Sequence, residues 1–107
     1  MIVFGVIAGA AFLSRGGDTF SYTPPSGGNY RFRLRKVGSN WRTYVLEQPA
    51  YAGRSSDGHM THRYYDDSQS QYYVCYDPMP QTESDGRAVA KRWAERTTRY
   101  IRYGESF

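Results

Sequence analysis

Alternating apolar and basic positions give the clearest strand signal in the chain. Residues 30–37 (YRFRLRKV) carry an aromatic or aliphatic residue at every second position, with arginine or lysine between, which is the period of a β-strand. Residues 41–48 (WRTYVLEQ) come after Gly-Ser-Asn, so the two stretches predict a hairpin with a three-residue loop. The register expected across that loop pairs Val37 with Trp41, Leu34 with Tyr44, Phe32 with Leu46 and Arg31 with Glu47.

This register divides the hairpin of residues 30–48 into two faces. The face expected to pack on the core contains Tyr30, Phe32, Leu34, Tyr44 and Leu46. The face expected to meet solvent or a partner contains Arg31, Arg33, Arg35, Thr43, Val45 and Glu47.

Residues 83–103 predict one amphipathic helix. Thr82 or Ser84 can cap its start, and Gly104 stands where a left-handed C-cap belongs. At about 100° per residue, one arc collects the apolar positions. The core face of this helix is therefore expected to contain Val89, Ala90, Trp93, Ala94, Thr97, Tyr100 and Ile101.

A second, tyrosine-rich hairpin is predicted over residues 59–76, with strands at 59–65 and 71–76 and a polar turn at 66–70. Neighbouring tyrosines in a strand point to opposite faces, so each Tyr-Tyr pair is expected to place one ring off the core. Residues 14–29, rich in Gly, Pro and Ser, predict a connector. The expected fold is a single α+β domain: an antiparallel sheet of four to five strands with one C-terminal helix packed on one face.

Residues 1–13 contain an apolar run of twelve residues. A spanning helix needs roughly 20, and a secretory signal needs a positive segment before the run, where only Met1 stands. Two alternatives stay open, a buried first strand of the sheet or an apolar docking arm. The expected location is the cytoplasm, with no membrane partner and the single cysteine reduced.

Charge is segregated along the 107 residues. The net charge is +4, from 14 basic and 10 acidic residues, and 17% of residues are aromatic. Basic groups gather in the first hairpin and along the helix, whereas acids gather in residues 57–85. Either these are ordinary solvated surfaces in which the acids neutralise the helix arginines, or they form a dipolar molecule that steers toward charged partners.

We expect a contact surface of arginine and tyrosine, because exposed tyrosine beside arginine is typical of protein-binding hot spots and of base-stacking platforms. The candidate partner-binding residues are Arg31, Arg33, Arg35, Arg42, Arg92, Arg96 and Arg99. The candidate aromatic contacts are Tyr64, Tyr65, Tyr72 and Tyr73.

Motifs for catalysis, metals and cofactors are absent from the sequence. His59 and His62, three apart in an expected strand, point to opposite faces and are expected to be solvated. Cys75 is flanked by apolar and aromatic residues and is expected to be a small buried hydrophobe. We therefore expect no catalytic residues, no metal and no cofactor. A ribonuclease-like site combining His59 or His62 with Glu47 and Arg31 stays open, because such sites leave no local motif.

In general type the chain resembles accessory proteins of phages and other mobile elements, including anti-CRISPR and related anti-defence inhibitors. The resemblance rests on one short domain, no catalytic motif and a charge-patterned aromatic surface. The basic charge departs from the acidic DNA mimics among these inhibitors, so the resemblance implies an inhibitor that docks on a nucleoprotein or protein complex. The alternatives are direct nucleic-acid binding and, less favoured, a small hydrolase or nuclease.

Overall fold

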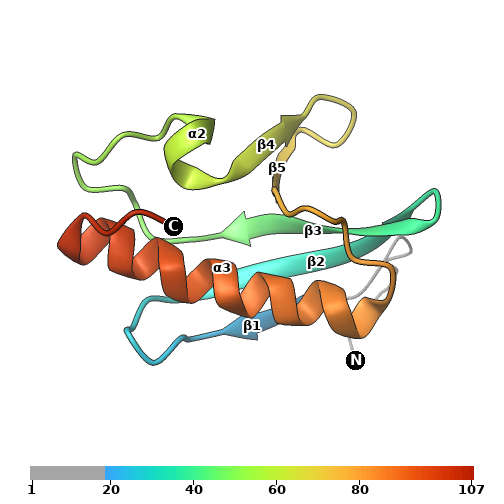
Figure 1. Cartoon of the computed structure of the whole chain (residues 1–107), viewed down its shortest axis with the longest axis horizontal. Helices are drawn as coiled ribbons and strands as arrows, with labels where there is room; N and C mark the ends of the chain where they lie inside the picture. The colour runs from blue at the N-terminus through green and yellow to red at the C-terminus, as the bar shows by residue number, and fades with distance from the viewer. Residues whose placement is uncertain (1–18) are drawn as a thin grey trace, which may run out of the picture.

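Five antiparallel strands form one sheet, and a long helix lies across one of its faces (Figure 1). The computed structural model describes residues 19–107, and the expectation for residues 1–13 lies outside them. The strand order is β1-β2-β3-β5-β4, and α3 packs on β2 and β3, which confirms the α+β class. The elements are β1 (Thr19–Tyr22), β2 (Tyr30–Val37), β3 (Asn40–Glu47), α2 (Gly58–Thr61), β4 (Arg63–Asp66), β5 (Gln71–Val74) and α3 (Glu83–Tyr103).

Helix α3 has the bounds that the sequence predicts. The Thr82 hydroxyl accepts a hydrogen bond from the Asp85 amide at 3.0 Å, and Gly104 ends the helix with a φ of 72°. All of the expected core residues are buried except Ile101, which is half-buried. Gly86 and Thr98 are also buried, and the hydrophobic period alone does not indicate them.

The predicted register of the first hairpin is wrong by one residue over most of its length. The turn contains two residues, with Val37 facing Asn40, so Leu34 faces Thr43 and Phe32 faces Val45. Two-residue turns suit the right-handed twist of paired strands when φ is positive, and Gly38 has a φ of 64°. A bulge then leaves Leu46 as an extra residue, and this restores the expected pairing of Arg31 with Glu47.

The corrected register exchanges residues between the two faces of β3. Thr43 and Val45, expected on the outside, are buried beneath α3 with exposed fractions of 2% and 7%. The Thr43 hydroxyl donates to the Gly86 carbonyl at 3.1 Å. Tyr44, expected on the same face as Leu34, instead lies on the face opposite α3, beside Arg33, and is buried there with an exposed fraction of 1%.

Three shorter elements also differ from expectation. The expected connector contains β1, in which Phe20 pairs with Phe32. The start of the expected third strand is the short helix α2, because the Asp57 side chain caps the His59 amide at 2.8 Å. The last strand ends at Val74. The observed hairpin is therefore shorter at both ends than the one predicted over residues 59–76.

The core lies between α3 and the central strands. The Trp93 ring meets Tyr30 and Phe32 edge-on, with centroids 6.0 Å apart in both pairs. The Trp93 indole N–H donates to the Thr61 carbonyl at 2.9 Å, which joins α2 to α3. The core therefore ties helix, sheet and the loop before β4 together.

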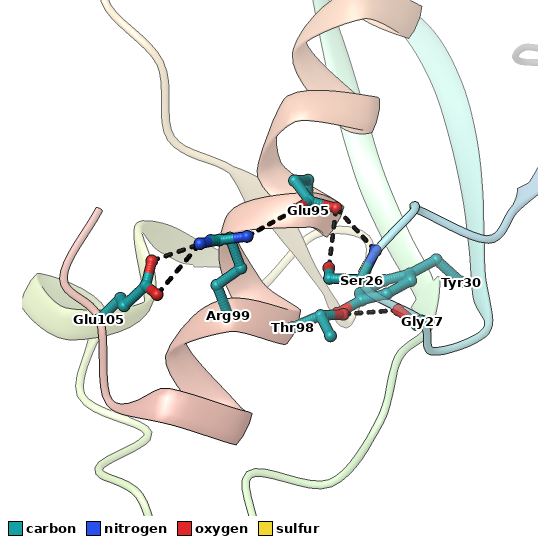
Figure 2. Close-up of polar contacts among 7 residues, drawn as sticks. All are labelled: Ser26, Gly27, Tyr30, Glu95, Thr98, Arg99 and Glu105. Atoms are coloured by element: carbon teal, nitrogen blue, oxygen red, sulfur yellow. Dashed lines mark hydrogen bonds and ion pairs between the residues drawn. The ribbon is translucent and has the colours of Figure 1, made fainter.

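The turn before β2 is fastened to α3 by hydrogen bonds (Figure 2). The Ser26 amide and hydroxyl both donate to Glu95, at 3.1 and 2.7 Å. The Thr98 hydroxyl donates to the Gly27 carbonyl at 2.8 Å, so the Tyr30 hydroxyl, 2.8 Å from Thr98, is the donor in their contact. These bonds fix the start of β2 and hence the direction in which its arginines point.

Candidate partner-binding face

The face of the sheet opposite α3 carries a continuous row of arginine and tyrosine. We call it the outer face. Its central row crosses four strands, because Arg33 on β2 faces Tyr44, Tyr44 faces Tyr73, and Tyr73 faces Tyr64 on the edge strand β4. Directly facing residues of an antiparallel pair point to the same side. The outer face consists of Arg31, Arg33, Arg35, Arg42, Tyr44, Tyr64, Asp66 and Tyr73.

Guanidinium groups and rings alternate on the outer face. The Arg33 guanidinium lies 5.4 Å from the Tyr44 ring centroid, and that of Arg42 lies 4.3 Å from the Tyr73 centroid. Tyr73 meets Tyr44 at 6.0 Å and Tyr64 at 5.9 Å between centroids. Planar guanidinium groups stack on aromatic rings and keep edge N–H donors available to other groups.

Asp66 anchors this face. Its Oδ2 accepts from the Tyr44 hydroxyl at 2.7 Å and from Arg42 Nη1 at 3.0 Å, while its Oδ1 accepts from the Ser68 amide and hydroxyl. The hydrogen bonds from Tyr44 and Ser68, with the nearby Arg42 charge, lower the pKa of Asp66 to about 2. Burial and the adjacent carboxylate raise the pKa of Tyr44. The positive charge of Arg42 is therefore largely balanced within the fold.

The three arginines of β2 are less neutralised than Arg42. Arg31 Nη1 is 3.9 Å from Glu47, and both side chains are well exposed, so water screens the pair. Arg33 donates to the neutral Gln69 amide oxygen at 3.1 Å. Arg35 makes no ion pair with any residue in 19–107, and with Lys36 it borders a hollow of about 200 Å³ that also includes Asp66 and Gln69.

The helix arginines lie on the other layer of the molecule. Arg92 and Arg96 are exposed on α3. Arg99 is held by Glu105, at 2.8 and 3.2 Å, and lies 3.6 Å from Glu95 (Figure 2). The helix arginines and the β2 arginines therefore do not share one face of the molecule. The structure thus separates two groups that the sequence analysis combined.

The four candidate tyrosines also divide between the faces. Tyr64 and Tyr73 belong to the outer face, whereas Tyr65 and Tyr72, 5.0 Å apart, point to the side of α3. This division confirms the alternation expected for neighbouring tyrosines. On that second side the Arg63 guanidinium lies 3.7 Å from the Tyr72 ring centroid and 5.0 Å from that of Tyr51.

Sequence reasoning missed Tyr44, Asp66 and Lys36 as members or neighbours of the outer face. A two-residue Gly-Ser turn was the available signal for Tyr44, since shortening the loop moves it to the arginine side. Asp66 belongs to the second hairpin and reaches Arg42 only because β5 adds next to β3, and that pairing has no local signal in the sequence.

The residues considered for catalysis do not converge. Arg31 lies on the outer face and Glu47 faces it across β2 and β3, whereas His59 and His62 lie beside β4, beyond β3 and β5 in the sheet. His62 stacks on Phe107 at 4.6 Å, and Cys75, expected to be buried, is half-buried. Within residues 19–107 no three His, Cys, Asp or Glu side chains are grouped to hold a metal ion.

No helix in the described part of the chain has the length and apolar character needed to cross a bilayer. No protein-family model, curated protein or solved structure matches this sequence or fold.

Proposed function

We propose that this protein is a non-enzymatic binding protein that docks through its outer face on a nucleoprotein complex, as an inhibitor of the anti-defence type. One observation carries the proposal: Arg31, Arg33 and Arg35 lie on the face that α3 leaves uncovered, the first exposed and the other two half-buried, and none is hydrogen-bonded to a carboxylate among the described residues. A surface with three such guanidinium groups favours a partner that presents phosphates or carboxylates.

The tyrosines beside these arginines supply contact area. Tyr64 is 55% exposed, and its ring rests on Tyr73, which in turn rests beneath Arg42. Rigid aromatic side chains lose little conformational entropy on binding, and tyrosine and arginine dominate binding hot spots. The Asp66 contacts hold Tyr44 and Arg42 in place, so this surface is ordered before a partner arrives.

Charge reversal on each layer tests the proposal. Arg31→Glu with Arg35→Glu changes the outer face and leaves Arg33, which packs on Tyr44, intact. Lys91→Glu with Arg102→Glu makes the same change in net charge at two exposed positions of α3 and is the matched control. Tagged protein is used to capture partners from host cells, and circular dichroism verifies folding of both variants. The outer-face variant should lose the captured complex and the helix variant should keep it.

The absorbance ratio at 260 and 280 nm of the captured material identifies the partner class. A nuclease-sensitive excess at 260 nm is expected for a nucleoprotein. Retained capture by the folded outer-face variant would refute the proposal. Material with no nucleic acid would refute the nucleoprotein partner and leave a protein complex.

A second candidate function is direct nucleic-acid binding. The observation that favours it is the exposed Tyr64 ring, which lies on the same face as the β2 arginines and offers a stacking surface. Mobility shift with single- and double-stranded oligonucleotides, at 50 and 200 mM salt, separates this function from docking on protein. Phosphate contacts predict affinity that falls steeply with salt, and no shift at the lower salt would exclude it.

A further inference from the structure

A cavity lies between α3 and β5, on the layer of the molecule away from the outer face. Its volume is about 210 Å³. Helix α3 rests closely on β2 and β3 through Ala90 and Ala94, whereas it makes fewer contacts with β5. The lining of the cavity contains four apolar side chains, Val74, Val89, Trp93 and Phe107, together with His62, Cys75 and Tyr76. The cationic groups at its rim are Arg92 and Arg96.

The rim arginines are available for an anion. Arg92 and Arg96 are one helical turn apart and exposed, and neither is paired with a carboxylate in residues 19–107. Arg99, the next arginine along α3, is already occupied by Glu105 and Glu95. Two unneutralised cations beside an apolar cavity favour a ligand that is both anionic and hydrophobic.

The chain itself shows how such a ligand sits on α3. After the helix, Glu105 forms a bidentate ion pair with Arg99, at 2.8 and 3.2 Å. Two residues later, the Phe107 ring stacks on His62 at 4.6 Å and forms one wall of the cavity. This surface therefore already binds a segment of its own chain in which an acidic residue pairs with a helix arginine and a following aromatic ring packs against the cavity.

We propose that the cavity binds an acidic peptide segment of a partner protein, with one large apolar side chain inserted and carboxylates on Arg92 and Arg96. The volume suits this occupant, since an apolar cavity of about 150 Å³ is enough to hold benzene. The site shares no residue with the outer face, so it can be tested separately from the proposed docking on a nucleoprotein. It gives the protein two binding surfaces, one on each layer.

A labelled peptide tests the site directly. The probe is fluorescein-labelled Glu-Glu-Ser-Phe-Glu-Glu with an amidated end, which repeats the Glu-Ser-Phe spacing of residues 105–107. Fluorescence polarisation is measured up to 1 mM protein. Replacing Phe by Ala in the probe should weaken binding at least about tenfold, the cost of losing one buried aromatic side chain. Replacing Glu by Lys should abolish binding.

Protein variants locate the site. Arg92→Glu with Arg96→Glu should weaken binding of the Phe probe at least about tenfold, whereas Lys91→Glu with Arg102→Glu, the same charge change at two other exposed positions of α3, should leave it unchanged. In heteronuclear NMR the indole N–H signal of Trp93 should shift on titration, and that of Trp41 should not.

The proposal would be overturned by no binding of the Phe probe, by equal affinity for the Ala probe, or by retained affinity in the folded variant that carries Arg92→Glu and Arg96→Glu. Sedimentation equilibrium tests a second copy as the occupant. Self-association that the Phe probe competes away would assign the cavity to residues 105–107 of another molecule and so overturn the partner peptide.

Discussion

The Thr43 hydroxyl donates to the Gly86 carbonyl at 3.1 Å, and this bond joins the sheet to the first turns of α3. Thr43 is 2% exposed. At Gly86 the helix comes so close that a Cβ atom would lie 2.8 Å from Leu34 Cδ2. The helix therefore approaches the sheet closely at a residue without a side chain, and the Thr43 hydroxyl reaches the backbone carbonyl of that residue.

Thr43→Val should destabilise the protein by about 1 kcal/mol, because it removes a buried hydrogen-bond donor while keeping the side-chain shape. Val45→Thr should also destabilise it, by burying a hydroxyl at a core position. Urea denaturation measures both free energies of unfolding. With the register that the sequence predicts, both side chains would face solvent and both changes would be close to neutral, so neutral results would contradict the observed register.

Gly86→Ala should lower the free energy of unfolding by about 1 kcal/mol. Alanine gains about 1 kcal/mol of helix propensity over glycine, but the fully buried Leu34 must move, and overpacking typically costs about 1–3 kcal/mol. Ala88→Gly, on the exposed side of the same helix, calibrates the propensity term. A gain in stability from Gly86→Ala equal to the Ala88→Gly loss would show that no close contact exists.

The sequence was sufficient for α3 because its caps and its hydrophobic period lie within one element. The hairpin register was not accessible in the same way: loops of two or three residues are both compatible with Gly-Ser-Asn, and one residue of difference exchanges the faces. The bulge at Leu46 conceals the error, since Arg31 faces Glu47 in either register. The sequence therefore predicts the wrong side of the sheet for both Thr43 and Tyr44.

The candidate site was predictable only in part. The alternation in β2 was enough to place Arg31, Arg33 and Arg35 on one face, because that inference needs a single strand. Which face α3 covers, and hence that Arg92 and Arg96 lie on the opposite layer, depends on tertiary packing. Asp66 and Arg42 meet across three strands, β3, β5 and β4, and no local pattern encodes that contact.

Asp66 should make stability depend on acid pH. Its pKa is lowered to about 2 in the folded protein, against about 3.9 in an unfolded chain. A lowered pKa contributes stability above the unfolded value, and this contribution is lost as the pH falls from about 4 to about 2. Thermal unfolding at pH 7, 4, 3 and 2 should show Asp66→Asn less stable than the parent at pH 7, with the difference shrinking in that interval.

Asp67→Asn is the matched control, because it removes the same charge from the neighbouring position of the turn. Its difference from the parent should not shrink with that of Asp66→Asn. Parallel behaviour of the two variants would assign the acid response to the overall charge of the turn, and not to the bonds from Tyr44 and Ser68.

Tyr30 should make stability depend on alkaline pH. Burial raises its pKa to about 12, against about 10 when unfolded. The folded state keeps the phenol neutral, so its contribution to the free energy of unfolding is intact below pH 10. This contribution falls as the pH rises from about 10 to about 12, by roughly 2–3 kcal/mol in all.

Tyr30→Phe, which loses the hydrogen bond to Thr98, should cost about 1 kcal/mol at pH 7. Because phenylalanine cannot ionise, the parent should lose this advantage in the alkaline range and then become the less stable protein. Urea denaturation at pH 7, 10 and 11.5 measures the crossing, and a constant difference would contradict a buried, neutral Tyr30 hydroxyl.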